Sequence, residues 1–360
     1  MNKFYDQSYL KINYLLCILI YSAFLLYDFK IYLLIFIIVL FFIPYLNIGK
    51  EIKKNHGIEK QSKSRLGGII ILITFISIYF TATELNFENL YFENINFFII
   101  VLLAISILGF VDDILGKLGH LIRLYFNIFA IFILLYTNEV LLFDKTYIQA
   151  LNSILDFKIM SFIVTIFVIV GFINASNISD GANGILSGIA FLIFLIFYYE
   201  TESLIYLTFF KIILIFFIHN FLIGNVYLGD AGSYLLGFLI SVNSLYLYNT
   251  DVIPAGLLAS ILCYPSIEVL MTIVRRLSKF NNPFLPDNNH LHNLIHNTLN
   301  KKELFPLNAN SLTGLIIIIV FAIPTLLLYI FFHYEFILIY WILFISQLLC
   351  YLLMYKLLKK

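Results

Sequence analysis

Long apolar runs separated by short polar segments make up nearly all of this chain. A membrane-spanning helix needs about 20 mostly apolar residues, so the pattern predicts about 12 spanning helices (a range of 10–12). Their approximate bounds are 9–27, 31–47, 66–82, 96–111, 121–138, 159–175, 183–199, 204–221, 233–248, 252–274, 313–332 and 335–355. The longest polar stretch, 275–312, is too short for a soluble domain. We therefore expect an all-α, polytopic membrane protein with a single domain, residues 1–360.

Composition supports this class. Hydrophobic residues make up 62% of the chain and charged residues 12%, and the mean hydropathy is +0.97, which excludes an ordinary soluble domain. The three cysteines, Cys17, Cys263 and Cys350, lie in separate apolar runs and have neither metal-site nor disulfide spacing. The first run lacks a small-residue cleavage site and is closely followed by another, so we expect an anchor and not a cleaved signal.

The basic residues predict the orientation of the chain. With the N-terminus in the cytoplasm, inner segments hold 18 of the 22 Lys and Arg residues, as expected if positive charge stays inside. Both termini are then cytoplasmic. The same side receives the segments 48–65, 112–120, 174–183, 222–232 and 275–312, which hold most of the candidate polar chemistry. We expect these segments to form one active site.

Two adjacent carboxylates, Asp112 and Asp113, close the fourth apolar run. Neighbouring carboxylates repel unless a cation binds them or one keeps a proton. Mg²⁺ favours one or two carboxylates completed by substrate phosphates and water, and a carboxylate beside it can act as general base. The alternative is a solvated helix end, although the helix dipole disfavours acidic groups there.

A second cluster, Asn174-Ala-Ser-Asn177-Ile-Ser-Asp180-Gly181, ends the sixth run. Asn177 and Asp180 are three residues apart and so share one face of a helix. Gly181 and Gly184 then allow a tight turn and a close approach of the backbone. The surface suits a nucleobase, a sugar or a metal-bound phosphate, but the same residue types also make ordinary turns.

The segment Gly229-Asp230-Ala-Gly232-Ser233 precedes the ninth run. Asp230 offers a further carboxylate for a metal ion. Ser233, together with backbone N–H groups at a helix start, suits an anion. Simple helix capping by Asp230 or Ser233 is the alternative.

Basic and histidine-rich segments flank these clusters. Arginine pairs bidentately with phosphate, and Lys60 and Arg65 in the first inner loop can screen a diphosphate. The longer segment holds Arg275, Arg276, Pro283, Pro286, Asp287, His290, His292 and His296. His290 and His292 suggest a zinc site, but no third ligand follows at a spacing typical of zinc sites, so zinc is disfavoured. Anchoring of the chain by positive charge on the cytoplasmic side is the alternative for the basic residues.

Taken together and in this order, the motifs resemble the polyprenyl-phosphate N-acetylhexosamine-1-phosphate transferase family, the MraY/WecA group of glycosyltransferase family 4. The double aspartate resembles the family's Asp-Asp motif, and 174–181 resembles its Asn-x-x-Asn-x-x-Asp-Gly motif. Residues 229–233 resemble its Gly-Asp-x-Gly-Ser loop. Residues 282–292 resemble the Pro-Phe-x-Pro-Asp-Arg-x-His-x-His-His loop of the WecA-like branch.

The resemblance implies a reaction. An undecaprenyl phosphate would attack the β-phosphorus of a UDP-N-acetylhexosamine, most simply UDP-GlcNAc, and UMP would leave. Mg²⁺ would be the cofactor, with Mn²⁺ as a second option. The step would begin a cell-surface glycan such as the O-antigen of lipopolysaccharide, at the bacterial cytoplasmic (inner) membrane. Homodimers occur in the family, so a homodimer is a further expectation; nucleic acid is not an expected partner.

The resemblance also implies roles for single residues. Asp112 would deprotonate the lipid phosphate, with Asp113 and Asp180 as further catalytic residues. Asp230 would hold the metal ion together with Asn177. The expected substrate-binding residues are Lys60, Arg65, Asn174, Asn177, Arg276, Asp287, His290 and His292.

Four positions depart from the family pattern. Asn183 stands where many members have a second acid, Asn288 where an Arg is usual, and Asn293 in place of the last His; Glu268 stands where an Asp is common. These departures leave the donor open, so a muropeptide transferase using UDP-N-acetylmuramoyl-pentapeptide is an alternative. A lipid-linked sugar transporter is an alternative of another class, but its ionisable groups should lie near the membrane midplane.

Overall fold

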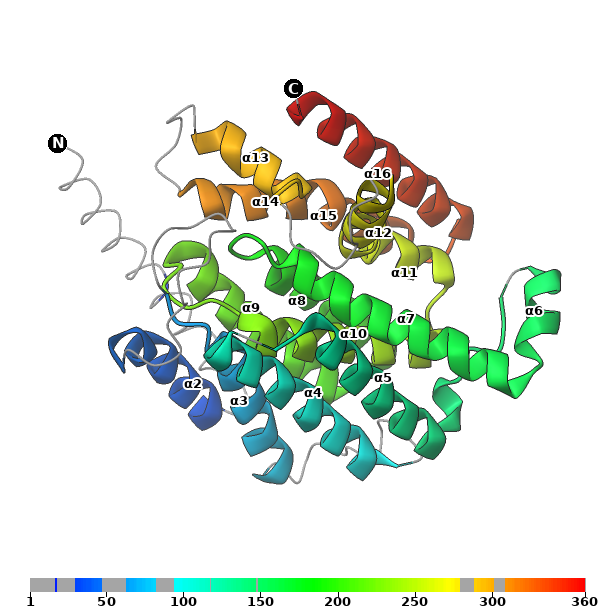
Figure 1. Ribbon diagram of the computed structural model, residues 1–360, viewed down its shortest axis with the longest axis horizontal. Coiled ribbons are helices and arrows are strands. Elements are labelled where there is room, and N and C mark those ends of the chain that lie inside the picture. The colour runs from blue at the N-terminus through cyan, green and yellow to red at the C-terminus, as the bar shows by residue number, and fades with distance from the viewer. Residues whose placement is uncertain are drawn as a thin grey trace.

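The computed structural model describes residues 17, 30–46, 63–81, 94–116, 118–146, 148–278, 288–300 and 308–359. Within these residues the regular structure is helical, apart from an isolated parallel bridge between Ser64 and Val226. The helices pack side by side as a bundle (Figure 1). Their bounds are α2 (Lys30–Phe42), η1 (Ile43–Leu46, a 3₁₀ helix), α3 (Gly67–Thr81), α4 (Ile95–Leu115), α5 (His120–Thr137), η3 (Glu139–Leu141, 3₁₀), α6 (Gln149–Leu155), α7 (Lys158–Ser179), α8 (Ile185–Thr201), α9 (Leu204–Leu222), α10 (Gly229–Asn249), α11 (Ala255–Ile261), α12 (Cys263–Leu277), α13 (Leu291–Asn300), α14 (Ala309–Phe321), α15 (Ile323–Phe332) and α16 (Ile337–Leu358).

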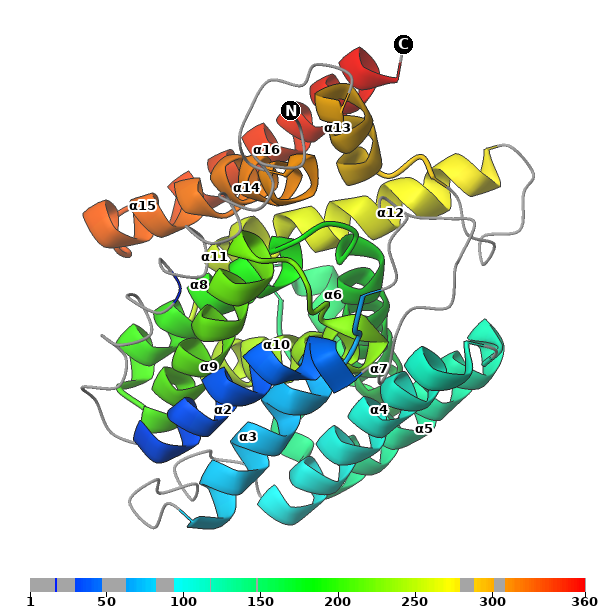
Figure 2. The ribbon, with the colours of Figure 1, turned by 90° about the vertical axis from the view of Figure 1, so that its left-hand side faces the viewer.

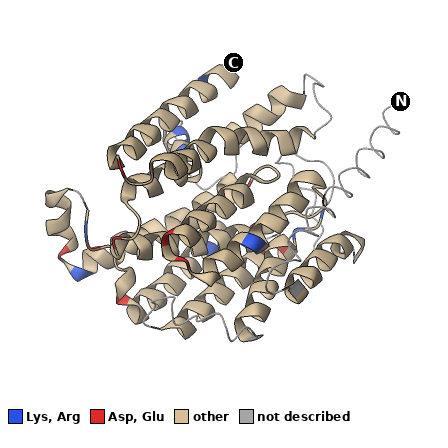
Figure 3. Ribbon diagram, turned by 180° about the vertical axis from the view of Figure 1, so that it is seen from behind, with Lys and Arg blue, Asp and Glu red and all other residues tan. Residues whose placement is uncertain are grey.

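The expected all-α membrane class is confirmed. Within the described residues, seven helices are long and apolar enough to cross a membrane: α4, α5, α7, α9, α10, α14 with α15, and α16. The bent pair α11 and α12 adds an eighth, and α2, α3 and α8 are shorter apolar helices. Every predicted run therefore corresponds to a helix or a helix pair, except 9–27, which lies outside the described residues apart from Cys17. The chain is a multi-pass membrane protein, and few charged residues interrupt its helices (Figure 3).

The predicted run 252–274 differs in detail, because α11 and α12 meet at an angle of 70°. Pro265 lies in the first turn of α12, and proline lacks the N–H that would continue the helical hydrogen bonds back to α11. After the bend, α12 runs between the α2–α10 bundle and the group α13–α16 (Figure 2). Its Leu270 and Val274 side chains are exposed, whereas Glu268 is completely buried. The polar face of α12 therefore points into the protein.

The start of α10 is pressed against two other helices. A Cβ at Gly68 of α3 would lie 2.1 Å from the Cα of Gly232, and a Cβ at Gly109 of α4 would lie 2.6 Å from the N of Ala231. Real Cβ atoms do not approach so closely, so glycine is required at both crossings. This close packing places Asp230, in the first turn of α10, beside the end of α4.

Candidate active site

The acidic motifs in the segments 112–120 and 174–183 lie at helix ends. Asp112 and Asp113 are in the last turns of α4, and both are buried. The helix continues past both residues and ends at Gly116, which has a φ of 59° and so adopts the left-handed conformation. Gly116 donates its N–H to the Asp112 carbonyl. Asn174 and Asn177 lie on α7, and Asp180 caps its C-terminus. Both motifs therefore lie at the C-terminal ends of their helices, α4 and α7.

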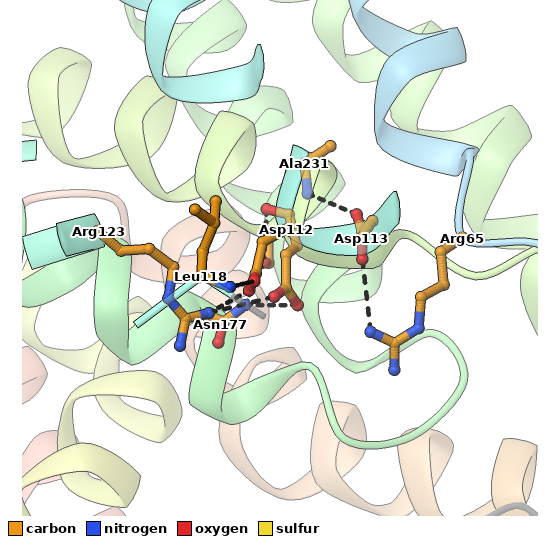
Figure 4. A network of polar contacts seen from close by, with 9 residues as sticks. Arg65, Asp112, Asp113, Leu118, Arg123, Asn177 and Ala231 are labelled. Atoms are coloured by element: carbon orange, nitrogen blue, oxygen red, sulfur yellow. Dashed lines mark hydrogen bonds and ion pairs between the residues drawn. The ribbon is translucent and has the colours of Figure 1, made fainter. Parts of the chain in front are cut away.

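Asp113 connects α4 to α10 and to the segment before α3. Its Oδ2 accepts the N–H of Ala231 at 3.0 Å, and its Oδ1 lies 3.4 Å from Nη1 of Arg65. Arg65 was an expected phosphate-binding residue, and the structure brings it to the carboxylates (Figure 4). Both oxygens of Asp113 are thus held in place by donors from two other segments.

Arg123 joins two further carboxylates, Asp112 and Asp230. Its Nη1 lies 2.5 Å from Oδ2 of Asp112 and 3.4 Å from Oδ2 of Asp230 (Figure 4). Asp112 also accepts the N–H of Leu118 at 3.2 Å. Sequence reasoning had counted Arg123 only among the cytoplasmic positive charges. The missed signal was a cation in the first turn of an apolar helix, because ionisable groups in spanning helices are usually functional.

Asn177 supports Asp230 from α7. Its Nδ2 donates to Oδ1 of Asp230 at 3.1 Å and to Oγ of Ser233 at 2.9 Å. Ser233 in turn donates to the Asp230 carbonyl at 3.2 Å. Asn177 and Asp230, the two expected metal ligands, therefore lie in direct contact, with the amide nitrogen of Asn177 turned toward the carboxylate.

Asp180 completes a group of charges in which negative charge is in excess. Burial, followed by the charges of Asp230 and Asp113, raises the pKa of Asp180 to about 7, and Arg65 opposes this shift. Four carboxylates, Asp112, Asp113, Asp180 and Asp230, thus lie around two guanidinium groups. Among the residues described, no three His, Cys, Asp or Glu side chains converge closely enough to hold a metal ion by themselves.

The histidine segment reaches the carboxylates through His292. A Cβ on Gly181 would lie 2.0 Å from Nε2 of His292, so this ring rests directly on the backbone next to Asp180. The other ring nitrogen, Nδ1, is 3.0 Å from the hydroxyl of Tyr264. Burial lowers the pKa of His292 to about 3, so this imidazole is neutral at physiological pH. His290 stacks on it, with ring centroids 5.2 Å apart and an angle of 4° between the planes.

Other expected residues are placed differently. Asn174 donates to the Val170 carbonyl of its own helix at 2.8 Å. Asn183 is buried, and its Nδ2 lies 3.2 Å from Oγ of Ser311 on α14. This amide ties α14 to the start of α8, which gives Asn183 a structural role in the described geometry. Arg276 is buried near the end of α12, and Lys60 and Asp287 lie outside the described residues.

Known proteins share this pattern. The model of glycosyl transferase family 4 matches residues 95–248, which carry all four carboxylates of the cluster. Over this segment the chain is similar to glycosyl transferase family 4. A relative from Thermotoga maritima, an undecaprenyl-phosphate alpha-N-acetylglucosaminyl 1-phosphate transferase, is 29% identical over 69% of this chain and 72% of its own. The family match and this relative indicate a phosphotransferase.

Two further relatives carry different transferred groups in their names. A phospho-N-acetylmuramoyl-pentapeptide-transferase from Wolbachia pipientis is 31% identical over 56% of this chain and 64% of its own. An undecaprenyl-phosphate alpha-N-acetylglucosaminyl 1-phosphate transferase from Escherichia coli K12 is 28% identical over 43% of this chain and 47% of its own. The chain thus aligns with less than two thirds of the length of these two proteins.

Proposed function

We propose that this protein transfers N-acetylglucosamine 1-phosphate from UDP-N-acetylglucosamine to undecaprenyl phosphate and releases UMP. A phosphate oxygen of the lipid forms a bond to the β-phosphorus of the donor. The anhydride bond between the α- and β-phosphates breaks, and its electrons leave with UMP. Two of the relatives carry this acceptor and this sugar in their names.

The cluster of four carboxylates and two arginines is the observation that carries the proposal. Phosphoryl transfer needs charge neutralisation and positioning more than covalent chemistry by the protein. Arg65 and Arg123 supply fixed positive charge at the end of the bundle where the acidic motifs lie. Each of them lies beside a buried aspartate. The surplus of negative charge among the four aspartates favours a divalent cation as the partner of the substrate phosphates.

Mg²⁺ fits the residues present. Asp230 would hold it, with Asp180 nearby and with Asn177 orienting the Asp230 carboxylate. The raised pKa of Asp180 supports this, because burial and the charge of Asp230 outweigh the opposing charge of Arg65, so a cation would stabilise the ionised carboxylate. When bound, the ion would neutralise charge on the donor diphosphate as the anhydride breaks.

Asp112 is the proposed proton acceptor, and Arg123 controls its basicity. In the structure the guanidinium of Arg123 lies against Asp112, which favours the ionised carboxylate and weakens it as a base. An incoming lipid phosphate competes for the same guanidinium. As the phosphate takes Arg123, Asp112 loses its cationic partner and becomes able to accept the phosphate proton.

The Wolbachia relative favours a second candidate, transfer of phospho-N-acetylmuramoyl-pentapeptide for peptidoglycan synthesis. The two reactions share acceptor, leaving group and carboxylate chemistry, and they differ in the size of the donor. Under either reaction we place the site on the cytoplasmic face of the bacterial inner membrane, since the basic residues gather at that end. The first reaction would begin a surface glycan such as O-antigen.

A donor panel tests the proposal. Purified protein in detergent receives undecaprenyl phosphate, Mg²⁺ and either UDP-N-acetylglucosamine, UDP-N-acetylgalactosamine or UDP-N-acetylmuramoyl-pentapeptide, and UMP release is measured. We expect release with UDP-N-acetylglucosamine that depends on the lipid and on the metal. Release with the muropeptide donor alone would assign the second candidate, and release without lipid would contradict both.

A further inference from the structure

Three side chains on one face of α12 hold the two stacked histidines. Tyr264, Glu268 and Thr272 are spaced four residues apart, so they follow one another along the helix surface. Tyr264 contacts Nδ1 of His292 at 3.0 Å, and Oε1 of Glu268 lies 2.9 Å from Nδ1 of His290. Thr272 is 3.4 Å from that same nitrogen. Side chains of α12 therefore hold each imidazole through its Nδ1 atom.

Glu268 is the centre of this support. Its side chain is 0% exposed, and a buried carboxylate is tolerated only when hydrogen bonds satisfy it. Besides His290, it accepts the backbone N–H of Leu291 at 3.2 Å and the hydroxyl of Tyr351 at 3.0 Å. Its donors come from the segment that starts α13 and from α16, so one carboxylate joins these elements to α12.

The carboxylate also selects the protonation pattern of the ring. As an acceptor at 2.9 Å it requires a proton on Nδ1 of His290, which makes Nε2 the other functional nitrogen of that imidazole. A histidine oriented in this way presents a defined atom to its substrate, because the ring can neither rotate nor exchange tautomers without breaking the bond to Glu268.

We propose that Glu268 is a positioning residue for His290, and that Tyr351 of α16 completes its support. The inference rests on the proposed function and on the expectation that His290 is one of the residues that bind the donor. Glu268 acts through Nδ1 and does not touch the substrate. The C-terminal helix, whose residues lie outside the family match, thereby becomes part of the donor site.

A double-mutant cycle tests the coupling. Glu268→Gln, His290→Ala and the double variant are compared for kcat and KM, with the nucleotide sugar and the lipid varied separately. We expect Glu268→Gln to lower kcat/KM for the nucleotide sugar about 10- to 100-fold, the usual effect of losing a partner that orients a histidine. KM for the lipid should stay within about twofold of wild type, because Glu268 and His290 act on the nucleotide sugar and do not alter binding of the lipid.

The double variant distinguishes positioning from a general structural role. If Glu268 acts through His290, adding Glu268→Gln to His290→Ala changes kcat/KM little. Losses that multiply in the double variant would overturn the proposal. Glu268→Asp keeps the negative charge and should retain more activity than Glu268→Gln. Tyr351→Phe removes one donor only, and it takes the place of Glu268→Gln in the cycle if that variant does not fold.

Glu200 provides a matched control at the opposite end of the bundle. Its carboxylate is also mostly buried and accepts bonds from a tyrosine, Tyr329 at 2.6 Å, and from a histidine, His333 at 3.2 Å. Glu200→Gln therefore removes the same chemistry far from the carboxylate cluster. We expect unchanged kcat and KM for both substrates, and a loss equal to that of Glu268→Gln would overturn the proposal.

A spectroscopic reading keeps this inference separate from the proposed function. Protein labelled with ¹⁵N-histidine in nanodiscs should show a signal of a protonated Nδ1 that disappears in His290→Ala and shifts in Glu268→Gln. A His290 signal of the Nε2-protonated tautomer in wild type would overturn the proposal. Absence of turnover with every donor, in protein that shows the expected signal, would count against the proposed reaction and leave the positioning of His290 supported.

Discussion

The imidazole of His292 occupies the space that a side chain at Gly181 would need. The Nε2 atom lies 2.0 Å from the position of a Cβ on Gly181, and two further ring atoms lie within 2.6 Å of it. His292 and Gly181 come from motifs more than a hundred residues apart in the chain. Their contact joins the histidine segment to the carboxylate cluster, so the two sets of residues form one site.

Gly181→Ala should therefore reduce activity by displacing the histidine. Gly181 does not have a positive φ, so the backbone tolerates alanine and the effect comes from the ring. His292 cannot retreat freely, because Tyr264 holds its Nδ1 and His290 stacks on it. We expect kcat/KM for the nucleotide sugar to fall about 10²-fold, as for a displacement of about 1 Å at a reacting centre. UMP release measures it.

Gly171 is the matched control for this change. It lies on the same helix, α7, and a Cβ there would meet nothing within 4 Å. Gly171→Ala should keep wild-type kcat/KM and slightly raise the melting temperature, because alanine favours helix more than glycine does. Equal activities for the two variants would show that the position of His292 does not matter for turnover.

Arg123→Gln should affect lipid and metal in opposite directions. The guanidinium lies between Asp112 and Asp230, so its loss leaves two carboxylates without their shared cation. A more negative cluster binds Mg²⁺ more tightly and the lipid phosphate more weakly. We expect KM for undecaprenyl phosphate to rise about tenfold or more, and the Mg²⁺ concentration for half-maximal rate to fall.

The experiment measures initial rates over a series of lipid and Mg²⁺ concentrations. Lys158→Gln is the control, because Lys158 pairs with Glu139 on exposed surface at the other end of the bundle and should alter neither constant. Parallel weakening of lipid and metal binding in Arg123→Gln would point to loss of local structure and would contradict the shared-cation geometry.

Asp112→Asn should strongly reduce turnover in protein that remains folded. The amide is nearly isosteric, so Leu118 can still donate to it, but it neither accepts the phosphate proton nor pairs with Arg123 as an anion. A general base contributes about 10²–10⁴-fold, and we expect a loss in that range. Asp251→Asn, at an exposed ion pair with Lys145, should keep its activity. Turnover near wild type in Asp112→Asn would remove this residue from the chemistry.

The sequence was enough to predict the helices because a continuous apolar run of about 20 residues is what a membrane-spanning helix needs. The bend between α11 and α12 was missed, although Pro265 was its signal, because hydropathy averaged over a window does not register one missing N–H. Asp112, Asp180 and Asp230 were predicted from their acidity in apolar surroundings. Their distances to one another depend on the crossing of α4, α7 and α10, which no local pattern encodes.

The sequence signal at Arg123 was ambiguous, and the contacts of Glu268 depend on the packing of distant helices. An arginine at a cytoplasmic helix end fits the positive-inside rule equally well whether or not a carboxylate faces it. Asn183 illustrates the converse, because it sits next to a motif yet bonds to Ser311 of α14 and lies outside the acidic cluster in the described geometry. Only the packing of distant helices decides which polar residues meet.

The last prediction concerns pH and Asp180. The pKa of this carboxyl rises from 3.8 to about 7 in the folded protein, chiefly through burial and then through the charge of Asp230. Between these two values the folded state binds a proton that the unfolded state releases, so stability of the metal-free protein falls as pH rises toward 7. A divalent cation replaces that proton. Its binding should therefore strengthen with pH through this window.

From pH 6 to pH 8 the ionised fraction of a group with a pKa of about 7 rises about tenfold, which corresponds to about 1.4 kcal/mol of metal binding. Thermal unfolding in detergent, with and without Mg²⁺, measures this at both pH values. We expect a clearly larger rise in melting temperature on adding Mg²⁺ at pH 8 than at pH 6, and a smaller, pH-independent rise in Asp180→Asn. The same Mg²⁺-induced rise at both pH values in wild type would mean that Asp180 does not exchange its proton for the metal ion.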